Sequence, residues 1–67
     1  PDEGLNKNQM KLLQTKLRNL GYDVGQIDGI LGAKTRRSIQ EVQSTLKKPA
    51  DAWPTIELLE NIVDLSN

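Results

Sequence analysis

The 67-residue sequence contains no cysteine, no histidine and no phenylalanine, and its only aromatic residues are Tyr22 and Trp53. Histidine is the commonest general base in enzymes, and cysteine supplies the thiolate nucleophile and most structural zinc ligands. A chain this short also buries only about 60% of the surface that its unfolded form exposes, which leaves little interior for a substrate pocket. These absences argue against an independent enzyme, a bound cofactor and a zinc site.

Long apolar runs and an excess of one charge are also missing. No run approaches the roughly 18 apolar residues that a membrane-spanning helix needs, and residues 1–3 lack the basic and apolar regions that open a signal peptide. Lys+Arg (9) balance Asp+Glu (9), and charged residues make up 27% of the chain, which is typical of folded soluble domains. We therefore expect a small folded module, cut from a longer protein, that does not insert into membranes.

Apolar residues at spacings of three and four predict an amphipathic helix over residues 6–20. Asn6, followed three residues later by Gln9, is the signature of an N-terminal capping box. Gly21 can take the left-handed conformation that commonly ends a helix. The start and the end of this helix are therefore both marked in the sequence.

The same spacing predicts two further helices. One covers residues 33–47 and ends before Pro49, whose ring pushes the preceding residue out of helical geometry. The other begins at Pro54, a favoured first residue of helices, with Asp51 as the candidate N-terminal cap. Three helices that each bury one apolar face predict an all-α fold, a compact three-helix bundle. It would occupy residues 6–65, with short tails at 1–5 and 66–67.

The connection between the first two helices, residues 21–31, is about twice the usual length of a helix–helix loop. It carries four aliphatic residues that a solvated linker would lack: Val24, Ile27, Ile30 and Leu31. We predict a long ordered loop folded onto the core, with turns at residues 23–25 and at Asp28-Gly29. Long ordered loops on small scaffolds often carry function.

Residues 17–43 contain a Leu-Gly-Tyr helix ending, an Asp-Gly turn, a Thr-Arg pair and a glutamine: Leu20-Gly21-Tyr22, Ile27-Asp28-Gly29, Gly32, Thr35-Arg36 and Gln43. This pattern resembles the signature of the peptidoglycan-binding domain family, the three-helix modules appended to bacterial cell-wall hydrolases. Two positions depart from it, since Val42 stands where the family usually has Phe, and Asp51-Ala52 stands where a second Asp-Gly is expected. Residues 49–59 are similar to the variant at the C-terminus of lytic murein transglycosylases.

The resemblance implies a non-catalytic module that binds the glycan strands or stem peptides of peptidoglycan. It would target a covalently linked hydrolase, a lytic murein transglycosylase, to the bacterial cell wall, and the catalytic residues would lie in an upstream domain. The implied location is the cell envelope, periplasmic or cell-wall associated. We expect a monomer with no cofactor, no metal and no nucleic-acid partner.

A site for peptidoglycan needs fixed backbone donors, a few polar side chains, a cation for carboxylates and an aromatic surface for the apolar faces of sugars. If the long connection lies beside residues 49–54, the bundle would gather such groups around one shallow groove. The candidate ligand-binding residues are Tyr22, Asp23, Asp28, Gly29, Arg36, Gln43 and Trp53.

Most of these residues also have a structural interpretation. Asp28 can hold its own turn by accepting backbone amides, which is the commoner role of Asp in turns. Gln43 can bridge the second helix to the long connection, because buried side-chain amides usually serve backbone groups. Trp53 can cover the core, and Tyr22 can pack against the first helix. The backbone amide of Gly29, in contrast, would be exposed because no side chain covers it.

Two other functions compete with cell-wall binding. Lys34, Arg36 and Arg37 open the second helix as basic residues do in nucleic-acid readers. A helix-turn-helix, however, uses a turn of only about three or four residues, much shorter than the connection at residues 21–31. Zero net charge also gives no general attraction to phosphate.

The second alternative, a protein-docking or structural domain of a larger envelope enzyme, stays open. All 9 cationic residues lie between residues 4 and 49, so the first two helices either pair with the more acidic third or present a cationic face.

Overall fold

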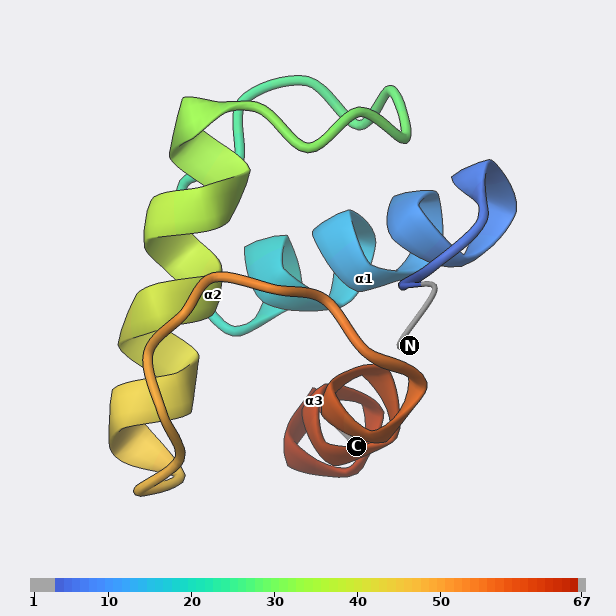
Figure 1. Cartoon of the computed structure of the whole chain (residues 1–67). Coiled ribbons are helices and arrows are strands. Elements are labelled where there is room, and N and C mark those ends of the chain that lie inside the picture. The colour runs from blue at the N-terminus through green and yellow to red at the C-terminus, as the bar shows by residue number, and fades with distance from the viewer. Residues whose placement is uncertain (1–3, 67) are drawn as a thin grey trace.

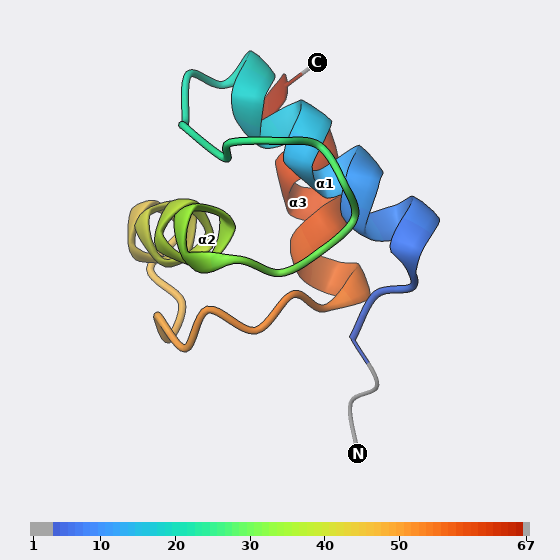
Figure 2. The ribbon, with the colours of Figure 1, turned by 90° about the horizontal axis from the view of Figure 1, so that it is seen from above.

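The computed structural model of the chain describes residues 4–66. Residues 1–3 of the predicted N-terminal tail and residue 67 of the predicted C-terminal tail lie outside the described part. The elements are α1 (Lys7–Asn19), α2 (Ala33–Thr45) and α3 (Ile56–Ser66), with no strand among residues 4–66. In Figure 1, α2 stands upright, α1 crosses the view and α3 is seen nearly along its axis, whereas Figure 2 shows α1 lying over α3. The predicted all-α three-helix fold is confirmed.

Helix α1 begins and ends through the local signals that the sequence contains. The side chain of Asn6 accepts a hydrogen bond from the Gln9 amide at 2.8 Å, and Gln9 Oε1 accepts one from the Asn6 amide at 2.9 Å. At the other end, Gly21 has φ 99°, and the Tyr22 amide donates to the Leu17 carbonyl at 3.0 Å. This Schellman ending satisfies carbonyls that the helix itself leaves free.

Helix α2 ends two residues earlier than predicted. Lys47, which was expected to be the last helical residue, takes a left-handed conformation with φ 59°. The Lys48 amide then donates to the Gln43 carbonyl at 2.8 Å, so α2 closes in the same way as α1 but without glycine. This ending stops the helix before Pro49 is reached.

Helix α3 begins at Ile56, and the prediction of a start at Pro54 with Asp51 as the cap is wrong. The Thr55 hydroxyl accepts a hydrogen bond from the Leu58 amide at 3.0 Å, which makes Thr55 the cap. Asp51 instead accepts a hydrogen bond from the Trp53 amide at 3.0 Å. No helix among residues 4–66 is long and apolar enough to cross a membrane.

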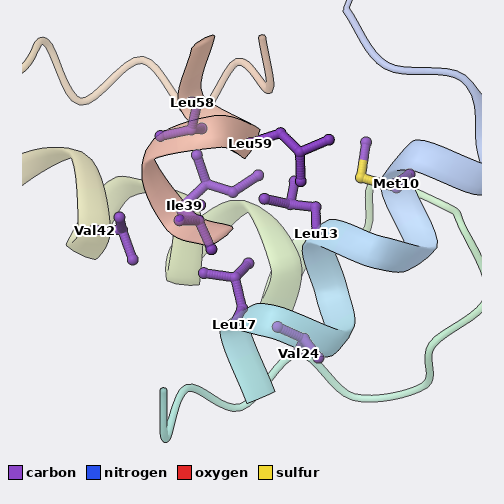
Figure 3. Close-up of a cluster of buried hydrophobic side chains, with 9 residues drawn as sticks. Met10, Leu13, Leu17, Val24, Ile39, Val42, Leu58 and Leu59 are labelled. Carbon is purple, nitrogen blue, oxygen red and sulfur yellow. The ribbon is translucent and has the colours of Figure 1, made fainter. Parts of the chain in front are cut away.

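The core lies where the three helices meet, and Figure 3 shows side chains from all of them converging there. Its buried apolar residues are Met10, Leu13, Leu17, Val24, Ile39, Val42, Leu58, Leu59 and Ile62. Val24 comes from the long connection, and Ile27 and Leu31 pack against the core from the same segment. Ile30 does not follow this prediction, because 63% of it is exposed. The connection is thus an ordered cover that leaves one aliphatic residue pointing outward.

Candidate functional site

The long connection is held to the bundle by Gln14, a residue of α1 that is 99% buried at 1% relative exposure. Its Oε1 accepts a hydrogen bond from the Gly29 amide at 2.9 Å. Its Nε2 donates to the Ile30 carbonyl at 3.0 Å, to Thr35 Oγ1 at 3.2 Å and, more weakly, to Asp28 Oδ1 at 3.4 Å. Gln14 therefore satisfies the polar groups at the tip of the connection.

Sequence reasoning missed Gln14, although a signal for it was present. Position 14 lies four residues after Met10 and three before Leu17, so it belongs to the apolar face of the helix. A polar residue at such a position is buried on folding and must find partners, since an unsatisfied buried amide costs about 1–3 kcal/mol. A glutamine on the inner face of α1 thus indicated a buried hydrogen-bond network.

Gln43 on α2 plays the corresponding role for the connection between α2 and α3. Its Nε2 donates to Asp51 Oδ1 at 2.9 Å, and its Oε1 accepts from the Ala52 amide at 3.0 Å. The expected bridge to the long connection is therefore wrong, and the bridge runs to residues 51–52. The Gln43 side-chain amide thus donates one hydrogen bond and accepts one within the protein.

Asp28 and Asp51 each hold a turn by accepting the amide of the residue two positions later, Ile30 at 2.9 Å and Trp53 at 3.0 Å. These backbone hydrogen bonds are the main reason that the pKa of each carboxyl lies below its ordinary value of 3.8. The side-chain amides of the two glutamines lower the pKa of each further. The structure thus gives Asp28 the turn-holding role.

Gly29 is required at its position for two reasons. Its φ of 77° is one that residues with a side chain rarely adopt, and a Cβ there would lie 2.6 Å from Lys7 Cγ and 2.9 Å from the Lys7 carbonyl oxygen. The expectation of an exposed amide is wrong, because this amide donates to Gln14. Gly29 therefore lets the connection lie directly on the start of α1.

Among residues 4–66, three of the surface pockets bear on the candidate residues. One, of about 270 Å³, lies between the long connection and the start of α2, and its lining includes Asp28, Ile30 and Lys34. A second, of about 160 Å³, lies at the α2–α3 connection, and Gln43, Asp51 and Trp53 contribute to it. The third, of about 350 Å³, is lined by Leu31, Ala33, Arg36, Arg37 and Gln40. The candidate residues are thus spread over separate pockets instead of one groove.

The two remaining candidates lie at the end of α1 and just beyond it. Tyr22 is half-buried and packs against the core. Asp23 accepts a hydrogen bond from the Gly25 amide at 3.1 Å and forms an ion pair with Lys34 at 3.5 Å. The Gly25 amide and then the charge of Lys34 lower the pKa of the Asp23 carboxyl below 3.8. Asp23 therefore contacts Gly25 and Lys34, two residues that line the first pocket.

The charges of the helices pair only in part. Lys48 and Glu57 form an ion pair at 3.1 Å that links the segment after α2 to α3. Within residues 4–66 the other ion pair is that of Lys34 with Asp23, so Arg36 and Arg37 are left with their charges directed to solvent at the third pocket. The start of α2 therefore presents a cationic surface.

Comparison with known proteins shows which family the chain belongs to. The family model described as "Putative peptidoglycan binding domain" matches residues 6–60, most of the chain. The chain belongs to this peptidoglycan-binding family. The resemblance found in residues 17–43 is thereby confirmed, and the two departures at Val42 and Ala52 are variations within the family.

Two solved structures are similar to this peptidoglycan-binding domain. SltB3 from Pseudomonas aeruginosa, in complex with NAG-anhNAM-pentapeptide, is 40% identical over 85% of this chain, with a TM-score of 0.81. SltB3 in complex with NAG-NAM-pentapeptide is 41% identical over 84% of this chain, with a TM-score of 0.80. The chain spans 15% of the length of either SltB3 chain. A search among curated proteins found no match.

Proposed function

We propose that this peptidoglycan-binding domain holds a covalently linked cell-wall hydrolase, a lytic murein transglycosylase, on the peptidoglycan of the bacterial envelope. The observation that carries the proposal is the 40% identity to SltB3, a chain solved with a disaccharide pentapeptide, of which this domain spans 15%. The domain acts as a monomer and contributes binding only. The chemistry belongs to the rest of the longer protein.

Trp53 and Arg36 are the proposed contacts with the polymer. Trp53 is 46% exposed, so a face of its indole is available to the apolar side of a sugar ring. Arg36 lies at the third pocket without an ion-pair partner among residues 4–66 and can bind a stem-peptide carboxylate through two parallel hydrogen bonds. Tyr22 and Asp23 lie at the start of the long connection, Tyr22 half-buried and Asp23 exposed.

The other three candidates act by holding the shape of the site. The polar side chains of Asp28 and Gln43 and the amide of Gly29 are engaged in hydrogen bonds within the protein. Their proposed role is to fix the two turns from which Ile30 and Trp53 project. Their replacement would change binding through the turn and would also change the free energy of unfolding.

Co-sedimentation with insoluble peptidoglycan sacculi tests the proposal. The native domain is expected in the pellet, and Trp53→Ala and Arg36→Ala should each weaken binding by about 3- to 10-fold, the loss of one stacking or charged contact. Leu65→Ala is the matched control, because Leu65 is 48% exposed on α3, outside the three pockets. Circular dichroism would establish that all variants fold.

A native domain that stays in the supernatant would refute cell-wall affinity. If removal of the domain still lowered the activity of the full-length hydrolase, the module would be a docking domain for its enzyme. If the native domain pellets and both substitutions behave like Leu65→Ala, peptidoglycan binding stands and the proposed contacts are wrong.

A further inference from the structure

The two glutamine-held turns are copies of one structural unit. Each aspartate accepts the amide two positions later, each glutamine accepts the amide of the residue between them, and each central residue is left-handed, with φ 77° at Gly29 and 60° at Ala52. Each glutamine follows a buried apolar residue of its helix, Leu13 or Val42. The two networks therefore share three hydrogen-bond types: a backbone amide to the aspartate, a backbone amide to the glutamine oxygen, and the glutamine Nε2 to the aspartate. Gln14 makes two further hydrogen bonds, to the Ile30 carbonyl and to Thr35, that have no counterpart at Gln43.

The match continues into the helix that follows each turn. Equivalent residues of the two turns are separated by the same number of positions in the sequence, as at 28 and 51, 29 and 52, or 30 and 53. The same separation holds for three positions of the helices that follow: the N-cap, the buried residue of the first turn, and the fully buried isoleucine. These further pairs are Gly32 with Thr55, Thr35 with Leu58, and Ile39 with Ile62.

The first two pockets are built from equivalent positions of this unit. In both, the lining contains the glutamine, the aspartate, the exposed apolar residue after the turn and the residue two positions past the helix N-cap. The equivalent pairs are Gln14 with Gln43, Asp28 with Asp51, Ile30 with Trp53, and Lys34 with Glu57. The unit therefore supplies the domain with two pockets of one design.

The two pockets differ at the positions that would meet a ligand. The first contains an exposed aliphatic residue, Ile30, and a cation, Lys34, whose side chain is 66% exposed. Its ion pair with Asp23 is long, at 3.5 Å, and such exposed pairs are weak, so a ligand carboxylate can take the place of Asp23. The second contains Trp53 and has an acid, Glu57, where the first has Lys34.

We propose that the domain contains two subsites, one in each copy of the unit. The subsite at Lys34 takes one carboxylate of a stem peptide, distinct from the carboxylate that Arg36 can bind at the third pocket, and the subsite at Trp53 takes the apolar face of an N-acetylated sugar. The two pockets have no lining residue in common, so the subsites are separate. In Figure 1 the two connections pass over different parts of the molecule. The inference rests on the proposed function, because both ligands are parts of peptidoglycan.

Titration of the isotope-labelled chain with two separate probes tests this assignment. Chitotetraose, a neutral oligomer of N-acetylglucosamine, is expected to shift amides of residues 48–58. The free stem pentapeptide, which carries carboxylates and no sugar, is expected to shift amides of residues 24–35. Lys34→Gln should weaken peptide binding about 5- to 10-fold and leave chitotetraose binding unchanged, and Trp53→Ala should do the reverse. Lys16→Gln and Leu65→Ala are the matched controls, and neither should alter binding of either probe.

A gain of binding tests the equivalence itself. Ile30 is 63% exposed, and its amide is held by Asp28 as that of Trp53 is held by Asp51, so Ile30→Trp should leave the fold unchanged. The variant is expected to show a second set of chitotetraose shifts, at residues 24–35. A folded Ile30→Trp variant without these shifts would overturn the equivalence of the two subsites.

The outcomes distinguish failure of the two-subsite inference from failure of cell-wall binding. If the native domain pellets with sacculi but both probes shift the same amides, or neither shifts any, the two-subsite inference is wrong and cell-wall binding stands. If the native domain does not pellet, the proposed function fails and takes the inference with it. Two distinct sets of shifts in a domain that pellets support both.

Discussion

The turn at Asp28 and the turn at Asp51 both have a central residue with positive φ, but in one it is Gly29 and in the other Ala52. In both turns the glutamine oxygen accepts the amide of the central residue and the aspartate accepts the amide of the next residue, so these two side chains define the turn. Gly29 has both a positive φ and too little space for a side chain, because it lies against Lys7, whereas the same place in the second turn is taken by Ala52, which also has a positive φ and is buried. One design can therefore carry different residues toward a ligand.

The largest effect is expected from breaking the two networks in turn. Gln14 makes hydrogen bonds with Gly29, Ile30, Thr35 and Asp28, whereas Gln43 makes them with Asp51 and Ala52. Gln14→Ala should lower the free energy of unfolding by about 3 kcal/mol, and Gln43→Ala by about 2 kcal/mol, because buried polar groups lose their partners and a cavity is left. Urea unfolding followed by circular dichroism measures both, and equal losses would contradict the ranking.

The central residues offer a sharper contrast. Gly29→Ala should destabilise the domain by about 2 kcal/mol or more, since a side chain is strained at φ 77° and meets Lys7. Ala52→Gly should change stability by less than about 1 kcal/mol, because relief at φ 60° is offset by the loss of a buried methyl group. Comparable effects of the two changes, by the same unfolding measurement, would mean that packing around Gly29 is not what demands glycine.

The helices after the two turns differ in their caps. Thr55→Ala should cost about 1 kcal/mol, because the Thr55 hydroxyl accepts the Leu58 amide, whereas α2 has no side-chain cap at Gly32. Gly32→Ser should add a few tenths of a kcal/mol, since a Cβ there meets no atom within 4 Å and the backbone is already extended. Thermal unfolding of both variants checks the signs, and a destabilising Gly32→Ser would show that α2 needs an uncapped start.

The smallest effect is expected from acid. Amide hydrogen bonds hold the pKa of Asp28 and of Asp51 below 3.8, so the folded state binds protons less readily than the unfolded state there. Their contribution to stability is complete above pH 3.8 and is lost as the pH falls through the folded-state pKa values. Asp28→Asn with Asp51→Asn keeps the acceptor oxygens but removes the charges, and should flatten the fall in unfolding free energy below about pH 4. An unchanged fall would assign it to other carboxyls.

The structural features that depend on residues close together in the sequence were predicted correctly at the two ends of α1. The capping box at Asn6 and the ending at Gly21 involve residues within five positions of each other, and both were confirmed. The start of α3 was misplaced because Pro54 and Asp51 are also common just outside a helix, where the Asp51 carboxylate serves the Trp53 amide. The local preferences of Pro54 and Asp51 do not distinguish the first residues of a helix from the residues just outside it.

The candidate site depended on contacts between distant segments and was predicted less well. Gln14 and Gly29 are 15 positions apart, and no spacing rule joins them. The single groove required the long connection to lie beside residues 49–54, but the two connections are held by different glutamines on different helices. Apolar periodicity indicates which face of a helix is buried without indicating which loop crosses it.

Titration of the isotope-labelled chain with an intact disaccharide pentapeptide tests the central claim most directly. Amides in both residues 24–35 and residues 48–58 are expected to shift, because one ligand carries both a sugar face and peptide carboxylates. Shifts confined to residues outside both turns, such as those around the exposed Leu65 of α3, would contradict this claim.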